Sequence, residues 1–263
     1  MQMLKTFISK HIKKRSPAWY SLHFFYDFLT GHLWLRLHAY FRRRRQVKNL
    51  PRYASKLLEE VLDACRIADI SPFPVRGTLL GFWRERGIVQ SDYDMDLGLL
   101  SQDFHKIEAL KKAMEQRSFK VRVDHRYLEP LRKIGERFSI QFVKPSLSLW
   151  VDFDLFYEID GQLAYIEDRR FDYTYEGKEF ADKNAFGADI AGFALVYPRE
   201  IFSSFKKMEF LNSEILIPVD TEKYLSLTYG DWSVPRQKNQ STYKNIKAVR
   251  YDPAAQGFNF LAI

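Results

Sequence analysis

Hydrophobic and polar side chains alternate most regularly in two short stretches of this chain. Asp94 and Asp96 alternate with a methionine and a leucine, and within residues 149–157 Asp152 and Asp154 alternate with apolar residues. Successive side chains of a strand point to opposite faces, so this pattern predicts two β-strands that each carry carboxylates on one face only. The opposite, apolar face of each strand is expected to lie in the core.

The spacing of apolar residues elsewhere predicts further helices and strands around these two strands. We expect helices in residues 52–69, 79–86, 101–114 and 220–229, and strands in residues 119–123, 138–143 and 163–166. The mixture predicts an α+β fold in which helices flank a mixed sheet. At 263 residues, the chain can bury one core domain, residues 51–263, preceded by a basic helical extension, residues 1–50.

The first acidic strand has the chemistry of a metal site. Asp94 and Asp96 share one face about 6.6 Å apart along the strand, and Asp92 falls on the same face. Carboxylate oxygens suit Mg²⁺ or Mn²⁺, and without a cation such a row of like charges is destabilising. If the second strand lies alongside, Asp152 or Asp154 completes the site or acts as a base, and the spacing does not decide which. The alternative is an edge strand whose aspartates face water.

A glycine-threonine turn precedes the first acidic strand. Gly77 and Thr78 stand between a short extended segment and a helical stretch, where backbone amides can approach a phosphate group. Arg84 is the basic residue best placed to hold a diphosphate, and Arg76 directly precedes the turn. Either arginine could instead pair with a neighbouring acid such as Glu85.

Three stretches of the chain, within about residues 55–235, carry a resemblance to a known family. They run from Gly77-Thr78-Leu79-Leu80-Gly81 to Asp94-x-Asp96, from Asp154-Leu155-Phe156 to Asp160-Gly161, and from Ile217-Pro218-Val219-Asp220 to Tyr229-Gly230-Asp231-Trp232. In these stretches the chain resembles the LicD family of the nucleotidyltransferase superfamily, which includes bacterial phosphocholine transferases and is related to fukutin and fukutin-related protein.

The resemblance implies a nucleotidyltransferase-like fold and a specific reaction class. A phospho-substituted alcohol, such as phosphocholine or an alditol phosphate, would pass from a CDP-linked donor to a hydroxyl of a surface or lipid-linked glycan. By position, Asp94 and Asp96 match the metal-binding pair of the family and Asp154 its later carboxylate, with Mg²⁺ or Mn²⁺ as the metal. This chain has Gln90-Ser91 where many bacterial members have Pro-Trp, so the donor alcohol is not carried over.

Two other functions remain open at this point. A nucleotidyltransferase that transfers the nucleotide itself would use the same carboxylates. A non-catalytic membrane-associated adaptor would keep only the fold, and the intact Asp94, Asp96 and Asp154 argue against it.

The positive charge is concentrated in the N-terminal segment. Residues 1–50 hold eleven Lys and Arg against one Asp, so this segment carries +10 and the remaining chain −2. Interleaved Trp, Phe, Tyr and Leu favour peripheral contact with an anionic membrane, on the cytoplasmic side, rather than a spanning helix. The alternative is a helical hairpin that packs on the domain or forms an oligomer contact. Nucleic-acid binding is not favoured, because no nucleic-acid module is recognisable. The single cysteine, Cys65, lies on an apolar helical face and is expected in the core.

Overall fold

The computed structural model describes residues 32–125, 139–167, 174–175, 178–179, 190–235, 246–252 and 257–260. The chain divides into two compact units, residues 1–46 and 47–263. In the first unit only residues from His32 onward are described, so most of the aromatic and basic segment expected from the sequence lies outside the described residues. The polar tail after Pro235 lies largely outside them as well.

Helix α3 (His32–Ile67) continues through Pro51, although the sequence predicted that one helical region ends there and another begins. Pro51 lies on the exposed side of the helix, whereas Leu50, Ala54 and Leu57 are fully buried. A proline removes one backbone hydrogen bond, but packing of the apolar side holds the helix together across it. The boundary between the two units, between residues 46 and 47, falls within α3 and not at Pro51.

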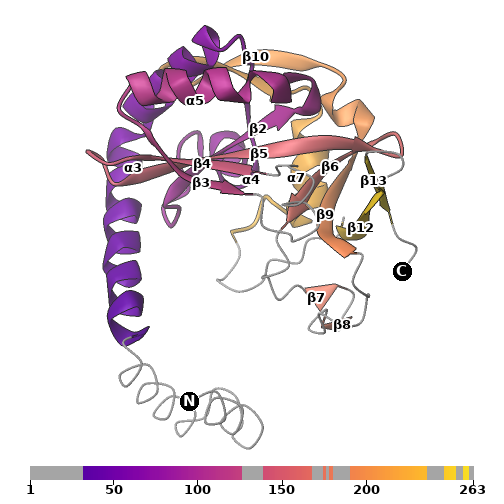
Figure 1. Ribbon diagram of the computed structural model, residues 1–263, viewed down its shortest axis with the longest axis horizontal. Coiled ribbons are helices and arrows are strands. Elements are labelled where there is room, and N and C mark those ends of the chain that lie inside the picture. The colour runs from indigo at the N-terminus through magenta and orange to yellow at the C-terminus, as the bar shows by residue number, and fades with distance from the viewer. Residues whose placement is uncertain are drawn as a thin grey trace, which may run out of the picture. The chain divides into compact units, whose positions relative to one another are not determined.

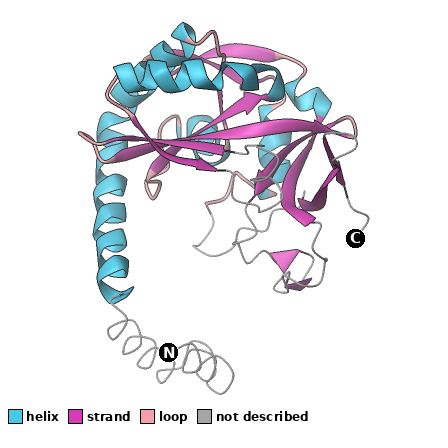
Figure 2. Cartoon of the chain, viewed as in Figure 1, coloured by secondary structure: helices cyan, strands magenta, loops and turns pink. Residues whose placement is uncertain are grey.

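In the described part of the chain, nine strands form one mixed sheet (Figures 1 and 2). Their bounds are β1 (Phe73–Pro74), β2 (Asp94–Leu100), β3 (Lys120–His125), β4 (Ser139–Lys144), β5 (Leu149–Ile159), β6 (Gln162–Glu167), β9 (Ile190–Pro198), β12 (Ile246–Asp252) and β13 (Gly257–Phe260). The order is β1-β2-β5-β6-β9-β12-β13, and β4 also pairs with β5 and carries β3. The β2–β5 pair is parallel, whereas the other pairs are antiparallel. These strands confirm the expected mixed sheet and α+β fold.

Two short hairpins and several helices complete the described structure. The hairpins pair β7 (Thr174–Tyr175) with β8 (Lys178–Glu179) and β10 (Phe205–Phe210) with β11 (Ser213–Pro218). The helical segments are α4 (Arg76–Leu80) with the π-helical turn η1 (Gly81–Glu85), the 3₁₀ turn η2 (Ser101–Lys106) with α5 (Ile107–Gln116), the 3₁₀ turn η3 (Arg199–Phe202) and α7 (Thr221–Tyr229). The helix expected from Ser101 thus begins as a 3₁₀ turn, and Ser101 provides no side-chain cap. Helix α7 ends at Tyr229, as the sequence predicted, and Gly230 follows it with a positive φ of 70°.

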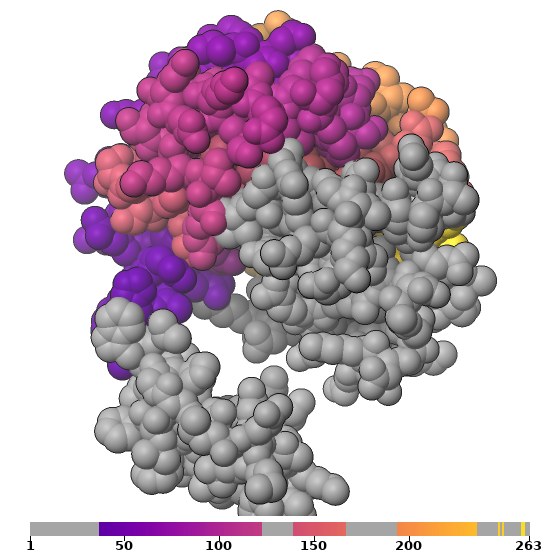
Figure 3. Space-filling model, in the orientation of Figure 1, coloured from indigo at the N-terminus to yellow at the C-terminus, as the bar shows by residue number. Residues whose placement is uncertain are grey.

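One face of the sheet is apolar and belongs to the main core. Met95 and Leu97 of β2 and Val151 and Phe153 of β5 are fully buried, in the same cluster as the inward sides of α3 and α5. Helix α5 lies above β2 and β5 in Figure 1 and contributes to the outer surface seen in the space-filling view (Figure 3). Cys65 is buried in this core, as predicted, and burial raises the pKa of its thiol.

The opposite face changes character along β2 and β5. At one end the ring of Phe73 lies across Gly98, where an added Cβ would come within 2.4 Å of Cε2 of Phe73. This ring packs against Phe156 and Phe202, with centroids 5.6 and 5.3 Å away. The aromatic cluster closes this end of the face, and the carboxylates predicted from the sequence lie beyond it.

Candidate metal centre

The parallel register of β2 and β5 brings three carboxylates together. Asp96 lies opposite Asp152, whereas Asp154 lies opposite Gly98. One carboxylate oxygen from each of Asp94, Asp96 and Asp152 lies within 4.8 Å of the other two, and all three residues are half-buried. We refer to these three residues as the acidic centre. It contains Asp94 and Asp96, which the alternating strand placed on one face, together with Asp152, one of the two aspartates that the sequence left open as a third carboxylate.

Electrostatics at the acidic centre favours a bound cation. Burial, followed by the charges of Asp152 and Asp92, raises the pKa of Asp94 to about 8. Burial and the charge of Asp94 raise the pKa of Asp96 well above its ordinary value, and burial raises that of Asp152 to about 6. Three carboxylates so close together cannot all be ionised at neutral pH without a compensating charge.

The hydrogen bonds of Asp152 also fit a metal. Its Oδ2 accepts a hydrogen bond of 2.8 Å from Nε2 of Gln141, whereas its buried Oδ1 has no partner among the described residues. A buried carboxylate oxygen without a partner is costly, and a hard cation is one group that satisfies it. The acidic centre therefore matches Mg²⁺ or Mn²⁺ in donor type, in charge and in its unsatisfied oxygen.

The glycine-threonine turn holds the first acidic strand in place. The backbone N–H of Asp96 donates to Oγ1 of buried Thr78 at 2.8 Å, and its carbonyl accepts from the N–H of Val75 at 3.1 Å. An added Cβ at Gly77 would lie 2.5 Å from Oδ2 of Asp92, so the glycine allows this carboxylate to approach. Thr78 thus positions Asp96, a member of the acidic centre, through its side chain, and its predicted amide contact with phosphate stays a prediction.

Asp154 lies outside the acidic centre and forms an ion pair with Arg76. Its Oδ2 lies 2.5 Å from Nε of Arg76, and its side chain is almost fully buried. Arg76 also lies over the ring of Tyr165, with 4.3 Å from its Cζ to the ring centroid. The sequence left open whether Asp152 or Asp154 is the third ligand, and the family resemblance pointed to Asp154. The geometry instead favours Asp152, because the register places Asp154 two residues further along β5, opposite Gly98.

A family model described as LicD/FKTN/FKRP, nucleotidyltransferase domain, matches residues 69–220, more than half of the chain. The chain belongs to this family. Membership indicates a transferase of the phosphotransferase or nucleotidyltransferase type, and it confirms the resemblance seen in the three sequence stretches. No curated protein matches the chain in a sequence comparison.

Arg84 of this LicD-family chain does not join the acidic centre through any described contact. Its Nη2 lies 2.6 Å from Oε1 of Glu85, and its Nη1 donates to the carbonyl oxygen of Trp232 at 3.1 Å. Pairing with Glu85 was the alternative that the sequence allowed. Arg84 therefore ties η1 to the segment that follows α7, and its predicted contact with a diphosphate remains untested.

Sequence reasoning missed two residues that support this LicD-family site. Gln141 on β4 holds Asp152, and Arg122 on β3 donates to Oε1 of Gln141. Arg122 also lies 3.7 Å from the ring centroid of Trp150, and its charge lowers the pKa of Asp152 against the larger effect of burial. The available signal was the polar residue Gln141 between apolar Ile140 and Phe142, which repeats the alternation of the acidic strands.

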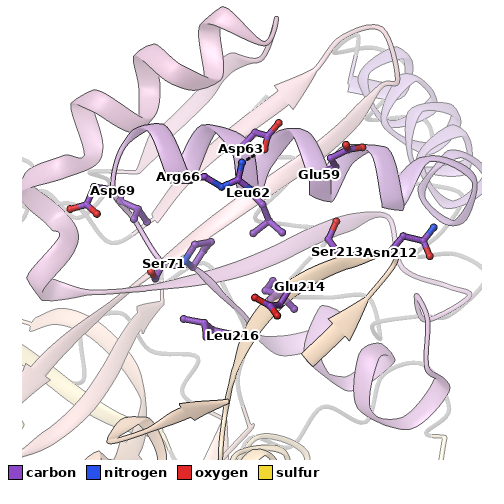
Figure 4. A pocket seen from close by; sticks show the side chains of 13 residues that line it. Glu59, Leu62, Asp63, Arg66, Asp69, Ser71, Asn212, Ser213, Glu214 and Leu216 are labelled. Carbon is purple, nitrogen blue, oxygen red and sulfur yellow. Dashed lines mark hydrogen bonds and ion pairs between the residues drawn. The ribbon is translucent and has the colours of Figure 1, made fainter. Parts of the chain in front are cut away.

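A separate cavity of about 510 Å³ lies between α3 and the β10–β11 hairpin (Figure 4). None of the residues of the acidic centre lines it. Three of the four acidic side chains that line it have basic partners: Asp63 lies 2.6 Å from Arg66, Asp69 lies 2.8 Å from Lys106, and Glu214 lies 2.7 Å from Lys207. Most of the negative charge of this cavity is therefore balanced locally, and the acidic centre remains the candidate site.

Proposed function

We propose that this chain transfers a phospho-alcohol group, of the phosphocholine or alditol phosphate type, from a CDP-linked donor to a hydroxyl of a cell-surface glycan. The acidic centre on β2 and β5, inside a LicD-family domain, is the observation that supports this proposal. Three converging carboxylates with one unsatisfied oxygen suit a reaction in which negative charge must be neutralised beside a phosphoryl group.

In the proposed reaction Asp94, Asp96 and Asp152 hold one or two Mg²⁺ or Mn²⁺ ions. The bound metal would neutralise charge on the diphosphate and orient it. Amides of Gly77 and Thr78 would contact the diphosphate as well. The acceptor hydroxyl attacks the donor phosphorus in line, a new P–O bond forms as the bond to CMP breaks, and CMP leaves while the hydroxyl proton is released.

The alternative is a nucleotidyltransferase that transfers the nucleotide to a small acceptor, and the description of the family domain supports keeping it. The two reactions use the same carboxylates and differ in their products. Phospho-alcohol transfer from a CDP-linked donor releases CMP, whereas nucleotide transfer from CTP releases pyrophosphate.

The decisive experiment offers the purified full chain a panel of CDP-linked alcohols, and separately CTP, with Mg²⁺ or with EDTA. We expect donor-dependent CMP release that EDTA abolishes and that Asp94→Asn and Asp96→Asn both lose. Asp63→Asn, at the exposed pair with Arg66, is the matched control and should retain activity. Pyrophosphate release from CTP without CMP release would support the alternative. Normal turnover by Asp94→Asn would remove the metal assignment.

We also propose that the first unit holds the enzyme against the inner face of the membrane, near a lipid-linked acceptor. In the described part of this unit, Leu37, Tyr40 and Phe41 are 47, 50 and 62% exposed and precede the arginine run 42–45. Among the described residues, no helix has both the length and the apolar character needed to cross a bilayer. Exposed aromatic side chains beside basic ones are typical of peripheral contact with anionic lipid.

Vesicle binding tests this placement. Full-length protein should sediment with phosphatidylserine vesicles at low salt and less at high salt, because each basic residue contributes about 1 kcal/mol that salt screens. Replacing Arg42, Arg43, Arg44 and Arg45 with Gln should release it, whereas Lys111→Gln with Lys112→Gln on α5 should not. Equal binding by the arginine variant would contradict the proposal.

A further inference from the structure

Arg76 adopts a backbone conformation that arginine rarely takes. Its φ is 47°, in the left-handed region that favours glycine, at the first residue of α4. The backbone N–H of Arg76 donates to the hydroxyl of buried Tyr224 at 3.2 Å, which helps to hold this conformation. Strained backbone of this kind persists where the surrounding structure enforces it, and it is concentrated at functional sites.

The side chain of Arg76 is fixed as firmly as its backbone. Nε lies 2.5 Å from the buried carboxylate of Asp154, and the guanidinium lies over the ring of Tyr165. The side chain nevertheless keeps 22% of its surface exposed. A cation is therefore held in one orientation, with part of it still accessible.

This fixed cation lies beside the acidic centre. The positive charge of Arg76 interacts with the carboxylates of Asp94, Asp96 and Asp152. Two roles are compatible with that position. Arg76 either only compensates the crowded negative charge, or it also binds a phosphate group that reaches the metal.

We propose that Arg76 binds a phosphate oxygen of the donor's diphosphate beside the metal, and that Asp154 is a positioning residue for Arg76 rather than a metal ligand. This inference rests on the proposed function. A guanidinium presents five N–H donors in a planar fork, which can bind a carboxylate along one edge and a phosphate along another. A residue needed only for charge would require neither the orientation by Asp154 and Tyr165 nor the enforced backbone.

Two binding measurements on the full chain separate these roles. One is the affinity for Mn²⁺, followed by electron paramagnetic resonance, and the other is the affinity for CDP in saturating Mn²⁺, followed by calorimetry. Arg76→Gln should weaken CDP binding about tenfold or more, the usual loss for a charge-assisted hydrogen bond. It should leave the Mn²⁺ affinity unchanged or tighter, because a positive charge has been removed beside the metal.

Asp154 provides the second arm of the test, with Asp152 as its matched comparison on the same strand. Asp154→Asn should weaken CDP binding and leave the Mn²⁺ affinity near that of the wild type. Asp152→Asn should lose Mn²⁺ affinity directly. Should Asp154→Asn lose Mn²⁺ as severely as Asp152→Asn, Asp154 is a ligand and the inference is overturned.

Further variants keep the test decisive if Arg76→Gln does not fold. Arg76→Lys retains the charge but not the fork, so it should keep the Mn²⁺ affinity and still bind CDP more weakly. Arg66→Gln, at an exposed pair on α3, should bind both probes normally. Wild-type CDP affinity in both Arg76 variants would show that Arg76 only compensates charge.

These results are independent of turnover. If the CDP-donor panel yields no CMP but Arg76→Gln weakens CDP binding, the inference stands and the proposed reaction fails. If CMP is released but neither CDP binding nor the donor KM changes in Arg76→Gln, the reaction stands and the inference fails. Failure of the wild type to bind CDP would also overturn the inference.

Discussion

Replacing Asp152 with asparagine should have opposite effects on the metal-free and metal-bound protein. Without a cation, the Asp152 carboxylate adds negative charge to a group that already holds Asp94 and Asp96. Asparagine has nearly the same shape, and its side-chain oxygen can still accept the hydrogen bond from Gln141. We therefore expect Asp152→Asn to stabilise the metal-free protein and to remove most of the stabilisation by Mg²⁺.

The size of this effect follows from the structure in two ways. Two unit charges 4.8 Å apart would repel by about 3.5 kcal/mol at an effective dielectric constant of about 20, and this is an upper limit because the raised pKa of Asp94 leaves that carboxyl largely protonated at pH 7. The rise in the pKa of Asp152 from 3.8 to about 6 corresponds to about 3 kcal/mol for the ionised form at pH 7. Because the buried amide of asparagine also loses hydration, we expect a gain of about 1–3 kcal/mol in the free energy of unfolding.

Urea unfolding at pH 7 in EDTA and in excess Mg²⁺ measures both effects. The wild type should gain about 2.7 kcal/mol when Mg²⁺ stands at a hundred times its dissociation constant, and Asp152→Asn should gain far less. Asp63→Asn, at an exposed ion pair, controls for the general effect of removing a carboxylate. If Asp152→Asn is less stable than the wild type in EDTA, or gains as much from Mg²⁺, the electrostatic account of the acidic centre is refuted.

Three further perturbations test the site and its support. Burial and neighbouring carboxylates raise the pKa of Asp94 from 3.8 to about 8, so between these pH values the folded protein holds a proton that the unfolded chain has lost. The free energy of unfolding of the metal-free protein should therefore fall as pH rises from about 4 to 8. Asp94→Asn should flatten this slope in EDTA. Thr78→Val leaves the N–H of Asp96 without its acceptor, so it should cost about 1–3 kcal/mol and weaken Mn²⁺ binding; an unchanged melting curve would contradict this. Gly98→Ala should lower the free energy of unfolding by about 1–3 kcal/mol, because the added methyl group overpacks against the ring of Phe73. Phe73→Leu in the same chain should recover part of this loss, and strictly additive effects of the two substitutions would contradict the account.

The sequence predicted the strands of the site because their alternation is local. Asp94 and Asp96 needed only the period of a strand to be placed on one face. The choice between Asp152 and Asp154 depended on the register between β2 and β5, which lie far apart in the sequence. A shift of two residues would have exchanged the two aspartates without changing either local pattern, so no reading of the separate strands could decide it.

The other differences also arise where long-range packing overrides a local rule. Pro51 is a local signal for a helix end, but the buried side of α3 continues past it through Leu50 and Ala54. The sequence favoured Arg84 over Arg76 as the arginine that holds the diphosphate, but neither local pattern shows which acid each arginine pairs with. Arg84 pairs with the adjacent Glu85, whereas Arg76 pairs with Asp154 across the fold.

The third stretch that carries the family resemblance, residues 217–232, supplies no carboxylate to the acidic centre and acts instead through long-range contacts. Tyr224 of α7, stacked 4.8 Å from Tyr197, accepts the backbone N–H of Arg76 at the start of α4. The carbonyl oxygen of Trp232, just beyond α7, accepts a hydrogen bond from Arg84, which lies near the end of η1, the turn that continues α4. The segment between the two arginines carries Thr78, which holds the backbone of Asp96. The region around α7 therefore fixes both ends of the α4–η1 segment, whose Thr78 holds the backbone of Asp96, and in this way the three separated stretches converge on the acidic centre.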